Sequence, residues 1–217
     1  MKKIAFYGGS FDPLHNGHLT IARKLIKIFE SDEFVFIPAF HAPHKKNKKP
    51  TSAFHRFAML CLATESEDKI KVSTIELDAP EKPFTFETQL KLKSELTDAE
   101  IFFVIGADSW SEIDTWREWK KVLTLTNIIV VTRPNYEIGF AHITEEIRSK
   151  ITDIRGNPKP KVQSPKSKVQ NIYITDAINL DISATEIRLK IRAGVSDWRE
   201  FVPPQVANYI EKYELYI

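Results

Sequence analysis

The residues of this chain best suited to chemistry are two histidines that follow a glycine-rich stretch. His15 and His18 come soon after Gly-Gly-Ser-Phe-Asp-Pro at residues 8–13. Because they stand three residues apart, a helical first turn would project both imidazoles to the same side. There they could donate hydrogen bonds or carry positive charge near neutral pH. This combination favours stabilisation of crowded negative charge, such as that of a triphosphate.

The alternative interpretations are an exposed turn whose histidines have no role, and part of a metal site. The HExxH spacing is absent, and the single cysteine, Cys61, is distant in the sequence. We therefore assign no metal ligands. Cys61 lies in an apolar helical run at residues 57–62, so we expect a buried structural thiol rather than a nucleophile.

A strand-to-helix turn must position the two histidines. Residues 4–7 have the pattern of a short buried strand, and apolar residues recur at helical spacing from Leu19 to Phe29. Backbone N–H groups at a helix N-terminus are unpaired and carry partial positive charge, so such a turn attracts phosphate. Gly17 lacks a side chain, which would let a ligand approach the backbone closely.

Strand and helix patterns alternate along the rest of the chain. Continuous apolar runs, such as residues 101–105, are typical of parallel strands buried on both faces. The alternation predicts an α/β fold with a doubly wound, Rossmann-like, mostly parallel sheet, helices on both faces and a C-terminal helical segment. We expect strands at 33–38, 70–77, 101–105, 127–132 and 171–175, and helices at 51–65, at 85–96 and twice more after residue 182.

Length and composition indicate one domain over residues 1–217, with a phosphate-binding C-terminal segment at about 182–217. No apolar run approaches the roughly 18 residues of a membrane span, and no signal peptide is evident, so we expect a cytoplasmic protein without a membrane partner. Residues 148–168 hold seven Lys or Arg and one Asp. Their prolines and lack of helical periodicity favour a solvated loop, so no nucleic-acid partner is expected.

Gly106 and Asp108 follow directly after the strand expected at 101–105. The glycine permits a close turn, and the aspartate could accept hydrogen bonds from ribose hydroxyls or an adenine amine. Capping of the next helix is the alternative role. Because ligands in doubly wound sheets bind beyond the carboxyl ends of the strands, we expect these residues near His15 and His18.

A last polar cluster precedes the closing helices. Ser183 and Glu186 have the S-x-x-E spacing of a capping box. The same helix N-terminus could bind phosphate oxygens through its N–H groups, the hydroxyls of Ser183 and Thr185, and the guanidinium of Arg188. The two roles are compatible.

Residues 8–18 and the segment Ile-Ser-Ala-Thr-Glu-Ile-Arg at 182–188 resemble the two signatures of the HxGH nucleotidyltransferase superfamily. Over essentially the whole chain, further motifs resemble bacterial nicotinate mononucleotide adenylyltransferases. They are P-H-K at 43–45, T-F-E-T at 85–88, T-W at 115–116 and T-R-P at 132–134. The resemblance implies that ATP and nicotinate mononucleotide react to nicotinate adenine dinucleotide (deamido-NAD) and pyrophosphate in NAD biosynthesis. It also implies Mg²⁺ as the cofactor that accompanies ATP.

The resemblance implies roles for three sets of residues. Trp116 would stack on the pyridine ring, although packing with Trp110 and Trp119 is its alternative from the sequence alone. The catalytic residues would be His15, His18, Lys45 and Arg188. The ATP-binding residues would be Gly8, Gly9, Ser10, Phe11, His15, His18, Gly106, Asp108, Ile182, Ser183, Thr185 and Arg188. The nicotinate mononucleotide-binding residues would be Ser10, His44, Lys45, Thr85, Phe86, Trp116, Arg117 and Arg133.

The chain departs from the family pattern at three places. Residues 148–168 look longer and more basic than the family needs, and we assign them no role. Asn135 replaces the usual glycine, and Phe84 stands where an S-Y or S-W pair often precedes the threonine. The alternatives are a phosphopantetheine or nicotinamide mononucleotide adenylyltransferase, an ATP-binding module without catalysis, and an RNA-binding protein that uses residues 148–168. The sequence does not distinguish a monomer from a homo-oligomer.

Overall fold

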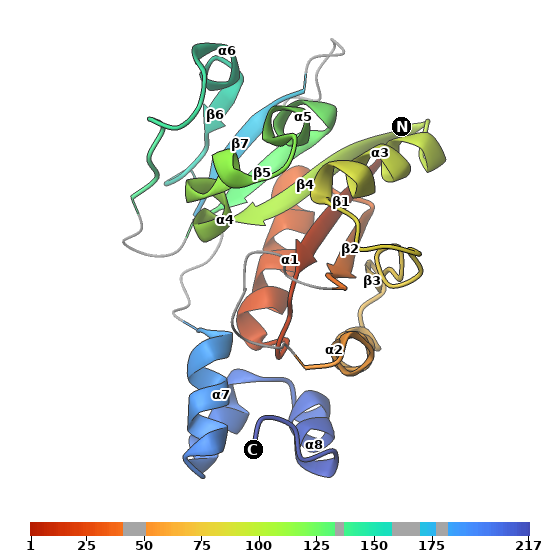
Figure 1. Ribbon diagram of the computed structural model, residues 1–217, viewed down its shortest axis with the longest axis vertical. Coiled ribbons are helices and arrows are strands. Elements are labelled where there is room, and N and C mark those ends of the chain that lie inside the picture. The colour runs from red at the N-terminus through yellow and green to blue at the C-terminus, as the bar shows by residue number, and fades with distance from the viewer. Residues whose placement is uncertain (41–50, 133–136, 158–169, 177–181) are drawn as a thin grey trace.

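The computed structural model describes residues 1–40, 51–132, 137–157, 170–176 and 182–217. Its seven strands form one sheet in the order β3-β2-β1-β4-β5-β7-β6, in which every strand pair is parallel (Figure 1). The predicted α/β doubly wound sheet is therefore confirmed. The strands are β1 (Lys2–Gly9), β2 (Glu33–Pro38), β3 (Ile70–Val72), β4 (Ala99–Gly106), β5 (Asn127–Val131), β6 (Ile151–Asp153) and β7 (Ile172–Thr175).

Helices cover both faces of the sheet, because strand side chains alternate between two apolar cores. In β1, Ala5 belongs to one core while Ile4 and Phe6 belong to the other. The first core holds residues of α1 (Asn16–Phe29), α2 (Ala53–Thr64), α7 (Ala184–Arg192), η2 (Ser196–Phe201) and α8 (Pro204–Lys212). The second core holds residues of α3 (Thr85–Glu95), α4 (Ala107–Ser111), η1 (Ile113–Thr115), α5 (Trp119–Leu125) and α6 (Glu145–Arg148).

Two expectations about the secondary structure are wrong in detail. The strand expected at 70–77 ends at Val72, since the chain then bends and Asp78 N–H donates to the Thr74 carbonyl. The basic stretch 148–168 is not a loop throughout, because β6 lies within it. This strand has three residues and pairs only with β7 at the edge of the sheet, so its polar residues lack the apolar pattern of a buried strand.

The expectation of a buried Cys61 is also wrong. Arg56, Met59, Leu60 and Ala63 form the buried stripe of α2, and Cys61 lies outside it with an exposed side chain. Neighbouring protein atoms still exclude part of the water around the thiol, and this desolvation raises its pKa. The thiol is therefore accessible but mostly protonated near neutral pH, which disfavours a nucleophilic role.

The C-terminal helices return to the end of the sheet where β1 ends and α1 begins (Figure 1). Asn16 Nδ2 donates to the Glu200 carbonyl at 3.0 Å, and His55 Nδ1 lies 2.9 Å from the Tyr209 hydroxyl. The first contact joins α1 to η2, and the second joins α2 to α8. The segment that follows the sheet is thereby fixed beside the glycine-rich turn.

Candidate active site

The strand order reverses between β1 and β4. From β1 the chain moves outward to β2 and β3, and it then returns to place β4 on the other side of β1. The carboxyl ends of these two strands are Gly9 and Gly106. In parallel sheets a ligand crevice opens at such a reversal. The predicted site residues at both strand ends therefore lie at one edge of the sheet.

The turn after β1 is held by an aromatic side chain underneath it. Phe11 adopts a left-handed backbone conformation with φ of 48°, which is uncommon for a bulky residue. Its ring is buried and packs edge-on against the rings of Tyr7, His18 and Phe36. A Cβ atom on Gly9 would approach this ring to 2.9 Å. Gly9 is thus required by the Phe11 ring, and the Phe11 side chain supports the turn from within.

The two histidines form a stacked pair at the start of α1. His15 is the N-cap residue, and its ring centroid lies 3.7 Å from that of His18. The His15 backbone N–H donates to His18 Nδ1 at 3.2 Å. Because Nδ1 accepts a hydrogen bond, the proton of the neutral His18 ring resides on Nε2. The distal nitrogen of His18 is therefore a hydrogen-bond donor.

Gly17 has a structural role in addition to the one expected. A Cβ atom at this position would lie 3.0 Å from Cε1 and Nδ1 of His15. The missing side chain thus makes room for the His15 ring, which is buried with 7% of its surface exposed. The glycine therefore maintains the stacked pair.

A small cavity of about 70 Å³, the histidine cavity, opens beside this pair. It brings together five of the predicted ATP-binding residues from three separate stretches of the chain: His15, His18, Gly106, Asp108 and Ile182. Its other lining residues are Tyr7, Gly17, Ile21, Ala107, Val131 and Thr132.

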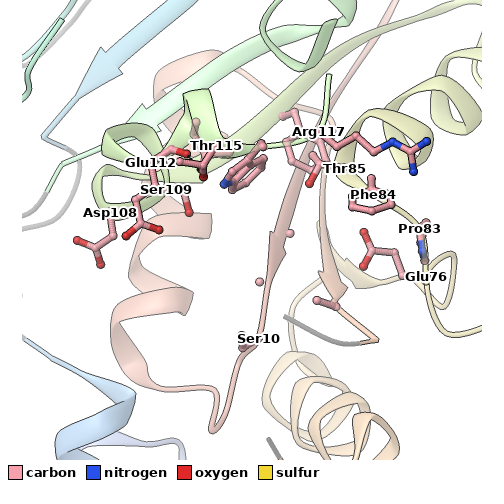
Figure 2. A pocket seen from close by; sticks show the side chains of 16 residues that line it. Ser10, Glu76, Pro83, Phe84, Thr85, Asp108, Ser109, Glu112, Thr115 and Arg117 are labelled. Atoms are coloured by element: carbon pink, nitrogen blue, oxygen red, sulfur yellow. Dashed lines mark hydrogen bonds between the residues drawn. The ribbon is translucent and has the colours of Figure 1, made fainter. Parts of the chain in front are cut away.

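A larger cavity of about 520 Å³, the aromatic cavity, opens at the same edge of the sheet (Figure 2). Figure 2 shows Asp108, Ser109, Glu112 and Thr115 on one side and Pro83, Phe84 and Glu76 on the other. Asp108 lines both cavities, so they adjoin at this residue. The aromatic cavity is lined by Gly8, Gly9, Ser10, Ala39, Glu76, Pro83, Phe84, Thr85, Phe103, Ile105, Asp108, Ser109, Glu112, Thr115, Trp116 and Arg117.

Predicted nicotinate mononucleotide-binding residues gather in the aromatic cavity. Trp116 lines it and is only partly buried, whereas Trp110 is completely buried in the core. The Arg117 guanidinium lies over the Phe84 ring at 4.7 Å and farther from the Phe86 ring, at 6.0 Å. Phe86 packs against the core and is not among the lining residues. Ser10 and Thr85 line the cavity, as do Gly8 and Gly9, which were predicted to bind ATP.

The C-terminal motif lies beside the glycine-rich turn. Ser183 caps α7 by accepting from the Thr185 N–H at 3.2 Å, while Glu186 is exposed, so the cap differs from the capping box expected. Arg188 donates to the Asp12 carbonyl and, at 3.1 Å, to Thr185 Oγ1. The two motifs therefore touch each other, although Ser183, Thr185 and Arg188 are not in the walls of either cavity.

Two residues of the site were missed by sequence reasoning. Arg56 is buried and donates to the carbonyls of Ser10 and Ala39, each at 2.6 Å, and thereby holds two lining residues of the aromatic cavity. A signal was present, since Arg56 shares the helical spacing of the buried apolar stripe of α2.

The second missed residue is Glu76, which lines the aromatic cavity and accepts a hydrogen bond from Thr88 Oγ1 at 2.9 Å. Burial raises its pKa to about 7, although the hydrogen bonds from Thr88 and the Phe40 backbone oppose the rise. No local pattern marks this residue in the sequence. His44, Lys45 and Arg133 lie outside the described residues.

Within the described ranges, no three His, Cys, Asp or Glu side chains gather in a way that could hold a metal ion. The cavities instead present imidazole, guanidinium and hydroxyl groups, together with the carboxylates of Glu76, Glu112 and, at their junction, Asp108. The imidazole, guanidinium and hydroxyl donors suit phosphate oxygens. No helix in the same ranges is long and apolar enough to cross a membrane.

Comparison with known proteins agrees with this geometry. A family model described as cytidylyltransferase-like matches residues 6–190. A probable nicotinate-nucleotide adenylyltransferase of Clostridium perfringens (strain SM101 / Type A) is 32% identical over 216 residues, which cover 100% of this chain and 98% of the relative. A protein of the same name from Thermoanaerobacter sp. (strain X514) is 35% identical over 215 residues, covering 99% of this chain and 94% of the relative.

Solved structures show the same fold. Plasmodium falciparum nicotinic acid mononucleotide adenylyltransferase superposes with a TM-score of 0.72 in its complexes with APC and with NaAD, at 22% and 21% identity. Each alignment covers 100% of this chain and 98% of the other. From the match over residues 6–190 and the full-length relatives, the chain belongs to the cytidylyltransferase-like family and, within it, to the nicotinate-nucleotide adenylyltransferases.

Proposed function

We propose that this protein transfers the adenylyl group of ATP to nicotinate mononucleotide, which yields nicotinate adenine dinucleotide and pyrophosphate. The observation that carries the proposal is the pair of adjoining cavities at the strand reversal, one beside stacked histidines and one with aromatic walls. The names of the full-length relatives support it, as does the NaAD-bound Plasmodium falciparum enzyme with the same fold.

The reaction needs no covalent intermediate on the protein. A 5′-phosphate oxygen of nicotinate mononucleotide forms a bond to the α-phosphorus of ATP. The bond from that phosphorus to the oxygen that bridges to the β-phosphate breaks, and pyrophosphate leaves with the electron pair. Because the attacking oxygen is already anionic, no general base is required. Positioning and stabilisation of charge therefore supply most of the catalysis.

His18 is suited to stabilise the reacting phosphates. Its Nδ1 accepts the His15 N–H, so Nε2–H is the ring donor that we assign to a phosphate oxygen. The N-terminus of α1 adds partial positive charge at the same place. His15 stacks on His18 and keeps its ring in this orientation. Arg188, beside the turn, and Lys45 would restrain the departing pyrophosphate.

The aromatic cavity is suited to the pyridine nucleotide. Trp116 would stack on the pyridine ring, and the backbone N–H of Arg117 would bind the nicotinate carboxylate. Thr85, at the first position of α3, offers a hydroxyl and the start of a helix to the same ligand. Ser10, which lines the aromatic cavity, and Arg133 would bind the 5′-phosphate.

Mg²⁺ is proposed to enter as part of the substrate MgATP. It is a hard cation that commonly binds to substrate phosphates with one or two protein carboxylates and several waters. One carboxylate, that of Asp108, stands where the two cavities adjoin, which fits a metal held mainly by the triphosphate.

The test is pyrophosphate release from MgATP with three acceptors in parallel: nicotinate mononucleotide, nicotinamide mononucleotide and phosphopantetheine. We expect rapid release with the nicotinate compound and loss of that release when a chelator removes Mg²⁺. Release with phosphopantetheine instead would refute the assignment of the aromatic cavity. ATP binding without release in any sample would indicate a non-catalytic ATP-binding module.

A further inference from the structure

The end of the chain folds back beneath the glycine-rich turn. Tyr216 is buried, with 9% of its surface exposed, and its backbone has a φ of 71°. A left-handed conformation is unfavourable for an aromatic residue, so tertiary contacts must impose it. Leu215 N–H donates to the Ile210 carbonyl at 3.0 Å, which turns the chain back after α8. The Tyr216 hydroxyl then donates to Asp12 Oδ1 at 2.7 Å.

Asp12 is the centre of a buried junction. With 8% of its surface exposed, it also accepts the Thr51 N–H on Oδ2 at 3.3 Å, and its carbonyl accepts from Arg188. These partners come from the segment before α2, from α7 and from the C-terminus. Asp12 itself precedes His15 by three residues. Its orientation therefore affects the part of the turn that leads into the stacked histidines.

The Tyr216 hydroxyl is a dependable donor to this carboxylate. Burial and the negative charge of Asp12 raise the pKa of the phenol, so it keeps its proton throughout the neutral and mildly alkaline range. A buried carboxylate oxygen that loses its donor must reorient or find another partner, because leaving it unpaired is costly. The effect of losing the hydroxyl would thus be felt at Asp12.

We propose that Tyr216 is a positioning residue for adenylyl transfer, whose hydroxyl fixes Asp12 and thereby the glycine-rich turn and the two histidines. The inference rests on the proposed function. The ring of Tyr216 belongs to the first apolar core, so the ring contributes to stability and the hydroxyl contributes to the geometry of the site. Substitution by phenylalanine separates the two contributions.

The experiment compares Tyr216→Phe with Tyr213→Phe in the full-length chain. Tyr213 lies three residues earlier, at the end of α8, and is 49% exposed, so its variant controls for loss of a phenol in the same segment. Steady-state rates are measured with MgATP and nicotinate mononucleotide, well below the unfolding temperature of each variant. We expect Tyr216→Phe to lower kcat about tenfold, since small misplacements of reacting groups are costly, with KM values within about twofold. A kcat within about twofold of that of Tyr213→Phe would overturn the proposal.

A second measurement keeps the inference separate from the proposed function. Side-chain ¹⁵N signals of His15 and His18 are recorded by NMR for the wild type and both variants. We expect shifts in Tyr216→Phe and none in Tyr213→Phe; unchanged signals in both variants would refute the positioning role. If the wild type proves inactive, the proposed function fails, while the NMR comparison still decides whether Tyr216 positions the histidines.

Discussion

The orientation of His18 gives a prediction that separates its two nitrogens. Nδ1 accepts the His15 N–H at 3.2 Å and so stabilises the start of α1, while Nε2–H is the proposed donor to the reacting phosphates. Asparagine would place an acceptor near the position of Nδ1 but has no distal donor. Glutamine reaches farther and can present an amide N–H near the position of Nε2. Alanine removes both functions.

The magnitudes follow from these two functions. Loss of a hydrogen-bond donor to the charge that develops in a transition state costs about 3 kcal/mol, which corresponds to a rate loss of about a hundredfold. Loss of an N-terminal capping contact costs about 1 kcal/mol of stability. We therefore expect His18→Ala and His18→Asn to lose about a hundredfold or more in kcat. His18→Gln should retain more activity, and His18→Asn should be the most stable of the three.

The assay is pyrophosphate release at saturating MgATP and nicotinate mononucleotide, combined with thermal unfolding of each variant. A folded His18→Ala protein with a near-normal kcat would show that the distal nitrogen does not stabilise the transition state. Equal activity of the Asn and Gln variants would show that the assignment of the two nitrogens is wrong.

Three further predictions concern stability and the shape of the site. The pKa of Glu76 is raised from 4.5 to about 7 in the folded protein. The Glu76 side chain therefore stabilises the folded protein most below the pKa of 4.5 that it has in the unfolded chain. This stabilisation is lost as the pH rises from there to about 7. Glu76→Gln should therefore gain stability relative to the wild type between these pH values, by on the order of 2–3 kcal/mol, in urea unfolding; a pH-independent difference would contradict this. Gln89 is completely buried, and neither its side-chain nitrogen nor its oxygen has a hydrogen-bond partner in the part of the chain that the structure describes. Gln89→Leu should raise the free energy of unfolding by about 1–2 kcal/mol in urea titrations, and a lower value would show that the amide is satisfied. Gly17→Ala would place a methyl group 3.0 Å from the His15 ring, so we expect kcat for pyrophosphate release to fall about tenfold. Normal turnover in this variant would show that the histidine pair tolerates displacement.

The fold could be predicted from the sequence because its central strands are buried on both faces. Such strands appear as continuous apolar runs, and residues 101–105 and 127–132 coincide closely with β4 and β5. β6 was missed because it is three residues long and lies at the edge of the sheet. Cys61 was misplaced because the run at 57–62 is apolar all round, so its composition does not show which face is buried.

Part of the site could also be predicted, for a topological reason. The ends of parallel strands meet at one edge, so polar residues in the turns that follow strands, such as His15 and Asp108, could be predicted to converge. Contacts between segments that are distant in the sequence produce no periodic or local pattern of residues, so they could not be predicted. The Tyr216–Asp12 hydrogen bond joins residues 204 positions apart, and Glu76 reaches its Thr88 partner from a bend between β3 and α3.

The fate of the α-phosphate of ATP tests the central claim most directly. ATP labelled at that phosphorus is incubated with Mg²⁺, nicotinate mononucleotide and the protein, and the labelled products are separated. We predict that the label appears in nicotinate adenine dinucleotide in a one-to-one ratio with released pyrophosphate. Label that remains in ATP, or that is released as AMP without transfer to the nicotinate compound, would contradict the proposed adenylyl transfer.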